Sequence, residues 1–73
     1  MKEMKFSLKT GEEYIELNQL LKLMQVVQSG GHAKLVIDDG LVTVNGEQEM
    51  RKRRKMRVGD KAEFDGTSIL VEA

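Results

Sequence analysis

The sequence predicts an α+β fold with two short helices and a small, mainly antiparallel sheet. Three observations carry this prediction. Apolar residues recur with helical spacing at positions 17–24 and again at 33–37. A β-branched, alternating segment at 41–44 ends in Asn45-Gly46, which favours a hairpin turn because both residue types tolerate positive φ. Two further alternating segments, 61–64 and 68–71, flank an Asp-Gly pair and predict a second hairpin.

Length and composition limit this fold to one domain over residues 1–73. The chain is 40% hydrophobic and 33% charged, a balance typical of globular proteins, and a chain of this size buries roughly 60% of the surface that it exposes when unfolded. Without cysteine, neither disulfides nor thiolate zinc sites can supplement the core. No segment approaches the ~20 apolar residues of a membrane span or the apolar run of a signal peptide. We therefore expect a cytoplasmic protein without membrane contact, and we favour a monomer.

Local signals predict the first strand and both helices. Residues 5–8 alternate like a short edge strand, and residues 9–12 suit a turn. Asn18 is a favoured N-cap type for the first helix, as Ser29 is for the second, and Gly40 is expected to end the second helix in a left-handed conformation. The expected buried faces consist of Leu17, Leu20, Leu21 and Met24 in the first helix, and Ala33, Val36 and Ile37 in the second.

A cationic run at residues 51–57 is the strongest functional signal. Six of the twelve Lys and Arg residues lie there, interrupted by Met56 alone: Arg51, Lys52, Arg53, Arg54, Lys55 and Arg57. Such dense like charge opposes burial, so we expect an exposed loop or irregular strand that re-enters a sheet around Met56 and Val58, before a turn at Gly59-Asp60. The net charge of the chain is zero, but residues 51–73 hold seven basic and four acidic residues. A local positive field of this kind can recruit a polyanion.

A second candidate anion site lies at the start of the second helix. Gly30 and Gly31 occupy its first turn although glycine has low helix propensity. The free N–H groups of a helix N-terminus can hold a phosphate. The alternative is a merely flexible helix start.

Catalysis and metal binding find little support in the sequence. The one histidine, His32, has no cysteine or second histidine near it, and Asp38 and Asp39 lie six and seven residues further along. Ser29 and His32 lack a third group that would complete a nucleophilic constellation. We expect a protein that is not an enzyme and that holds no metal or cofactor.

A set of motifs between residues 15 and 65 resembles a known family. These motifs are Leu17-Asn18, Ser29, Ala33-Lys34, the string GLVTVNG from Gly40 to Gly46, and Gly59-Asp60. Their order resembles the RNA-binding domain of the ribosomal protein S-four type, also called the alpha-L motif, and in particular its small stand-alone bacterial members. The resemblance implies two helices against a small twisted sheet, and binding to structured RNA that is often ribosomal.

The sequence departs from the family pattern at two positions. Gly30 stands where the family usually has an arginine, and Glu16 replaces a frequent basic residue. In return, residues 51–55 are far more basic than the corresponding segment of relatives, so we expect the RNA-contacting surface to have moved partly onto this loop. The expected RNA contacts are Arg51, Lys52, Arg53, Arg54, Lys55, Arg57, Lys34, Gly30, Gly31 and Asn45.

The chemistry of the run suits the phosphates of structured RNA. Arginine presents a planar fork of donors to phosphate oxygens and lysine acts as a point charge. The three aromatic residues, Phe6, Tyr14 and Phe64, are expected to pack in the core, which disfavours single-strand binding by stacking. The predicted function is RNA binding in ribosome assembly or translation. The alternatives are a protein-interaction adaptor whose basic loop binds an acidic partner, and a small enzyme of unrecognised type.

Overall fold

Helical and strand-like spacing of the apolar residues produces two helices and seven strands in the computed structural model, which describes residues 2–73. The elements are β1 (Lys2–Ser7), β2 (Ile15–Glu16), α1 (Leu17–Leu23), α2 (Gly30–Asp38), β3 (Thr43–Val44), β4 (Glu47–Gln48), β5 (Lys55–Met56), β6 (Lys61–Phe64) and β7 (Thr67–Glu72). One sheet has the strand order β1-β7-β6-β3-β4, and β2 pairs with β5 in a separate two-stranded sheet. The predicted α+β class is confirmed.

The sheet is mainly antiparallel, as predicted. The pairs β3–β4, β3–β6 and β6–β7 in the large sheet are antiparallel, and so is β2–β5. The exception is β1, which lies parallel to β7 along the edge of the large sheet, with Lys2 opposite Thr67. The edge strand predicted at residues 5–8 is therefore present, although it begins earlier and ends at Ser7.

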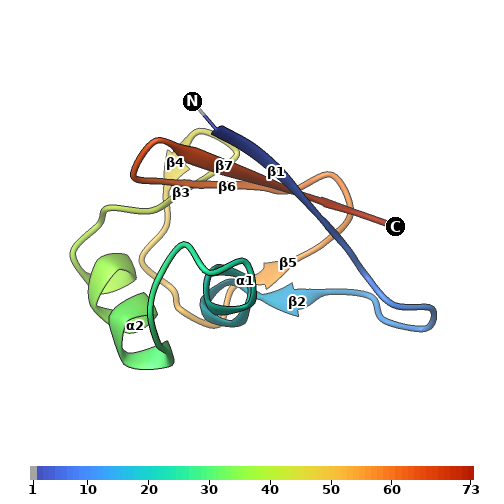
Figure 1. Cartoon of the computed structure of the whole chain (residues 1–73), viewed down its shortest axis with the longest axis horizontal. Helices are drawn as coiled ribbons and strands as arrows, with labels where there is room; N and C mark the ends of the chain where they lie inside the picture. The colour runs from blue at the N-terminus through green and yellow to red at the C-terminus, as the bar shows by residue number, and fades with distance from the viewer. Residues whose placement is uncertain (1) are drawn as a thin grey trace.

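Both helices and the β2–β5 pair lie on one side of the five-stranded sheet (Figure 1). Helix α1 turns a fully buried stripe towards the sheet, formed by Leu17, Leu20 and Leu21, with Met24 packed at its margin. Helix α2 contributes Ala33, Val36 and Ile37, as predicted. These residues and the inward side chains of the strands make one apolar core. No helix within residues 2–73 is long and apolar enough to span a membrane.

The predicted cap of α2 is confirmed, and the predicted cap of α1 is wrong. The hydroxyl oxygen of Ser29 accepts a hydrogen bond from the backbone N–H of His32 at 3.1 Å, and Gly40 follows the helix with φ +73°. Helix α1 begins one residue before Asn18, and its N-cap residue is Glu16, whose side chain forms no capping bond. The reason is tertiary: the backbone carbonyls of residues 54 and 52 accept the N–H groups of Leu17 and Asn18, two of the free donors in the first turn of the helix.

The two predicted hairpins are also present. Asn45 and Gly46 both have positive φ, +53° and +84°, which matches the turn expected between β3 and β4. Asp65 and Gly66 adopt the same signs between β6 and β7. Strand β3 is shorter than the predicted segment and begins at Thr43.

Candidate functional site

Residues 51–57, the basic loop, are fixed to the fold by their backbone. The N–H of Leu17 donates to the carbonyl of Arg54 at 2.9 Å, and the N–H of Asn18 donates to the carbonyl of Lys52 at 3.0 Å. Further along, Met56 is fully buried and pairs with Ile15 between β5 and β2. The loop therefore caps helix α1 and then re-enters a sheet, as predicted for Met56. Val58, which the sequence also placed in the re-entering strand, lies beyond the end of β5 and is 58% exposed.

One buried carboxylate, that of Glu49, binds two arginines of the basic loop. Glu49 is only 6% exposed, and its two oxygens accept four hydrogen bonds from Arg51 and Arg54. Arg51 donates its backbone N–H and its side-chain Nε at 3.0 Å and its Nη2 at 2.9 Å, while Arg54 donates Nη1 at 2.9 Å. The hydrogen bonds from Arg51 lower the pKa of Glu49 to about 2, with a further contribution from Arg54 and against the opposing effect of burial. Glu49 is thus ionised at neutral pH and holds two arginines in place.

The two arginines are not equally free to meet a ligand. The side chain of Arg51 is 72% exposed, whereas that of Arg54 is 29% exposed and its Nε is buried without a hydrogen-bond partner in the protein. The sequence predicted both side chains in solvent, and this is wrong for Arg54. The reason is the buried Glu49, to which the guanidinium of Arg54 must reach inward.

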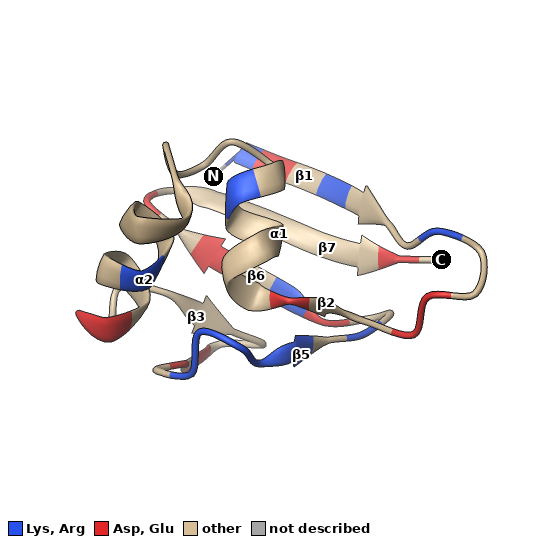
Figure 2. Ribbon diagram, turned by 90° about the horizontal axis from the view of Figure 1, so that it is seen from below, with Lys and Arg blue, Asp and Glu red and all other residues tan. Residues whose placement is uncertain are grey.

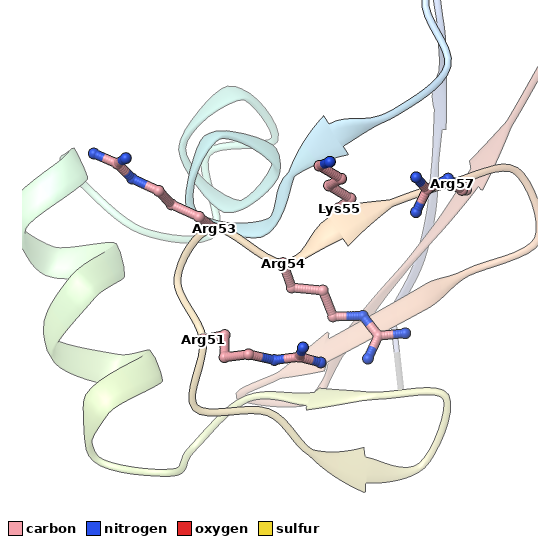
Figure 3. A pocket seen from close by; sticks show the side chains of 5 residues that line it. All are labelled: Arg51, Arg53, Arg54, Lys55 and Arg57. Atoms are coloured by element: carbon pink, nitrogen blue, oxygen red, sulfur yellow. The ribbon is translucent and has the colours of Figure 1, made fainter.

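The cationic side chains gather around an open groove of about 600 Å³. Its lining consists of Arg51, Arg53, Arg54, Lys55 and Arg57 (Figure 3). Arg51 and Arg54 extend in the same direction in this view, and Arg53 points the opposite way. The structure therefore brings together five of the six cations of the run; Lys52 is half-buried and does not line the groove. Figure 2 shows the basic segment along one side of the molecule, leading into β5.

The far end of the loop is held by Asp60. Its Oδ2 accepts the backbone N–H of Arg57 at 2.8 Å, and its Oδ1 accepts the side-chain N–H of Asn45 at 2.9 Å. Burial raises the pKa of Asp60, but these hydrogen bonds, together with the charges of Arg54 and Arg57, lower it overall. The turn at residues 59–60 is thereby tied both to the loop and to the β3–β4 hairpin.

The other predicted contact residues lie outside the groove lining. Lys34 is exposed on α2, and Gly30 and Gly31 are exposed in the first turn of that helix. A Cβ added to Gly30 would meet nothing within 4 Å, so no close backbone approach inside the protein requires glycine there. Asn45 uses both side-chain polar atoms within the protein, because its Oδ1 also accepts the backbone N–H of Lys61 at 2.9 Å. Its side chain thus joins the turn between β3 and β4 to the turn at residues 59–60.

Tyr14 is a candidate that the sequence reasoning missed. The aromatic residues were expected in the core, where Phe6 and Phe64 do pack in part, but Tyr14 is 38% exposed. The Nζ of Lys55 lies 5.2 Å from the centroid of its ring and the Cζ of Arg57 lies 5.8 Å from it. Alternation was the available signal: Tyr14 directly precedes β2, in which Ile15 is buried, and continuing the alternation by one residue places Tyr14 on the outer side.

A metal site is not formed by the residues described. Within residues 2–73, no three His, Asp or Glu side chains gather closely enough to hold an ion. The Nδ1 of His32 accepts a hydrogen bond from the backbone N–H of Gln28 at 3.1 Å, so the imidazole is bound to the segment just before α2.

The fold and the site together define a small α+β domain that presents a fixed cationic loop beside a helical hairpin. The sequence pattern of the S4 domain family matches residues 6–72. The chain belongs to this family, as its motifs indicated.

Two bacterial proteins are similar to the chain in sequence, and one of them also has the same fold. The chain is 48% identical over 54 residues to a Bacillus subtilis protein named "Probable ribosome maturation protein RlbA", which covers 74% of this chain and 76% of that protein. It is 43% identical over 60 residues to YbcJ of Escherichia coli, which covers 82% of this chain and 86% of YbcJ. The solution structure of YbcJ superposes with a TM-score of 0.72 and 42% identity, over 94% of this chain and 86% of that one. That structure is described as revealing an alpha-L motif involved in RNA-binding, and the present chain has the same fold.

Proposed function

We propose that this protein binds structured RNA, in particular ribosomal RNA, and acts in ribosome assembly or translation in the cytoplasm. The observation that carries the proposal is the basic loop: six cations on seven residues are anchored by backbone bonds to α1, and a single buried carboxylate, Glu49, pairs with two of them. The loop therefore keeps a strong positive charge in a defined shape.

A fixed array of cations suits a ligand with regularly spaced phosphates. Arg53, Lys55 and Arg57 have exposed side chains without ion-pair partners within residues 2–73. Arg51 uses its Nε and Nη2 for Glu49, which leaves Nη1 to bind a phosphate oxygen. Because A-form RNA hides its deep major groove, such a loop meets the backbone and the shape of a stem before its sequence.

The names of the relatives support the biological setting. YbcJ is described with a motif involved in RNA-binding, and the Bacillus subtilis relative carries a ribosome maturation name. Lys34 and the N–H groups at Gly30 and Gly31 offer a second place where the RNA backbone is bound, on the exposed start of α2.

The proposal is tested by the salt dependence of binding to a structured ribosomal RNA fragment. Binding that releases counterions makes log K fall linearly with log salt, and about four phosphate contacts give a slope of about −3 to −4. The variant to compare carries Arg53→Gln, Lys55→Gln and Arg57→Gln, which removes three exposed charges and leaves the Glu49 ion pairs intact.

We expect this triple variant to bind more weakly and to flatten the slope by about two units. A control variant with Lys5→Gln, Lys9→Gln and Lys22→Gln has the same net charge and loses exposed lysines from β1, the following turn and α1. It should keep the parent slope. Equal slopes for the parent and the loop variant would show that the loop is not the RNA surface. Weak RNA binding by the parent, unchanged by the substitutions, would favour an acidic protein partner instead.

A further inference from the structure

The position of Tyr14 follows from the pairing of β2 with β5. Ile15 lies opposite Met56, and both are buried. Continuing this antiparallel register places Tyr14 opposite Arg57 on the outer face, where the ring contacts the cationic heads of Lys55 and Arg57. The ring is therefore held next to two residues that line the basic groove, and Tyr14 as a whole residue is 38% exposed.

The surroundings of the ring suit a nucleobase that is attached to a phosphate. Lys55 and Arg57 lie 5.2 and 5.8 Å from the ring centroid and also line the groove, so they attract a phosphate to a place beside the ring. A nucleobase is flat, uncharged and attached to a phosphate, so it can lie on the exposed part of the ring while its phosphate meets the two cations. Stacking of a base on an aromatic side chain is worth about five- to a hundredfold in affinity.

We propose that Tyr14 is a stacking platform for one unpaired nucleobase, next to the phosphate-binding groove. The preferred ligand is then a paired RNA stem with an unpaired nucleotide beside it, whose backbone lies on the basic loop and whose base lies on the ring. This inference rests on the proposed RNA-binding function and adds to it the kind of RNA that is preferred.

A purely structural role for Tyr14 makes a different prediction. If the ring serves only to position Lys55 and Arg57 through cation–π contacts, its loss should weaken every RNA ligand by the same factor. If it stacks on a base, its loss should weaken only those ligands that carry an unpaired nucleotide. The comparison of two RNAs separates the two roles.

The experiment uses one RNA hairpin with a blunt end and the same hairpin with a single unpaired nucleotide at its end. Dissociation constants are measured for the parent, Tyr14→Leu, Tyr14→Phe and the control Leu23→Ala, which truncates an exposed apolar side chain on α1. Because Tyr14 is the one tyrosine of the chain, selective isotope labelling of tyrosine lets its ring protons also be followed by NMR. A base stacked on the ring shifts them upfield.

We expect the parent to bind the hairpin with the unpaired nucleotide at least about fivefold more tightly than the blunt one. This preference should disappear in Tyr14→Leu and remain in Tyr14→Phe and Leu23→Ala, and the ring protons should shift only with the unpaired nucleotide present. Equal binding of the two hairpins by the parent, or an equal loss for both in Tyr14→Leu, would overturn the stacking role while RNA binding stands. Failure of the parent to bind either hairpin would refute the proposed function itself.

Discussion

Replacing Glu49 by glutamine should destabilise the domain at neutral pH by an amount that the structure lets us work out. At about 1.4 kcal/mol per pH unit, lowering the pKa of Glu49 from 4.5 to about 2 corresponds to about 3 kcal/mol of stabilisation by the ionised form. Small domains have a total stability of about 5–15 kcal/mol, so this loss is large. It should lower the melting temperature by about 10 to 20 °C.

The pH dependence gives the same prediction a second test. Because the folded-state pKa of Glu49 is depressed, its contribution is fully present above about pH 4.5 and is lost as the pH falls through about 2. The difference in unfolding free energy between the parent and Glu49→Gln should therefore shrink over this window. Urea denaturation at pH 7, 5 and 3 measures it.

Glu47→Gln is the matched control for this experiment. Glu47 is exposed in β4, two residues before Glu49, and makes no ion pair among residues 2–73. Its replacement should change the unfolding free energy by no more than about 0.5 kcal/mol. Equal stability of Glu49→Gln and the parent at pH 7 would refute the view that Glu49 organises the basic loop.

Substitutions at three further positions test the turns next to the site. Gly46→Val places a β-branched residue at φ +84° with open space around it, so backbone strain alone should lower the unfolding free energy by at least about 1 kcal/mol, as measured by thermal unfolding. A melting curve identical to that of the parent would refute the predicted strain. Gly40→Ala should cost more than Gly46→Ala, because the added Cβ would displace the side-chain amide of Gln48 from its 3.0 Å hydrogen bond to the Gly40 carbonyl, whereas the space around Gly46 is open. The reverse order would contradict this. Asn45→Ala removes the hydrogen bonds from Asn45 to Asp60 and Lys61 and should lower the unfolding free energy by about 1 to 2 kcal/mol. The RNA affinity of the folded variant should stay within about twofold of that of the parent. A larger loss of affinity would show that Asn45 contacts the RNA.

Features that depend on a few neighbouring residues could be predicted from the sequence. The turn at Asn45-Gly46 needs only two residues that tolerate positive φ, and both adopt it. Ser29 caps α2 through a bond three residues away. The exposure of much of the basic run likewise follows from its own charge density, which no packing could accommodate.

Features that depend on distant parts of the chain could not be predicted in this way. Asn18 is a favoured cap type, but the carbonyl groups of residues 52 and 54 reach the start of α1 across the fold and make a side-chain cap unnecessary. Nothing in the order of residues distinguishes Glu49 from Glu47, yet only Glu49 points inward and binds Arg51 and Arg54. The same inward bond explains why Arg54 is less exposed than its neighbours in the run.

Tyr14 is an intermediate case, because the alternation of side chains in a strand would have placed it outside once Ile15 was known to be inside. What the sequence did not show is the pairing of β2 with β5, which joins Ile15 to Met56 and Glu16 to Lys55 and brings the ring to Lys55 and Arg57.

The most direct test of the central claim is to map the RNA-bound surface on the protein. Backbone amide signals of the ¹⁵N-labelled protein are followed by NMR during titration with a structured ribosomal RNA fragment at moderate salt. The largest changes should fall in residues 51–57, with smaller ones at the start of α2. Changes confined to the strands β1, β6 and β7, with the basic loop unaffected, would contradict the account.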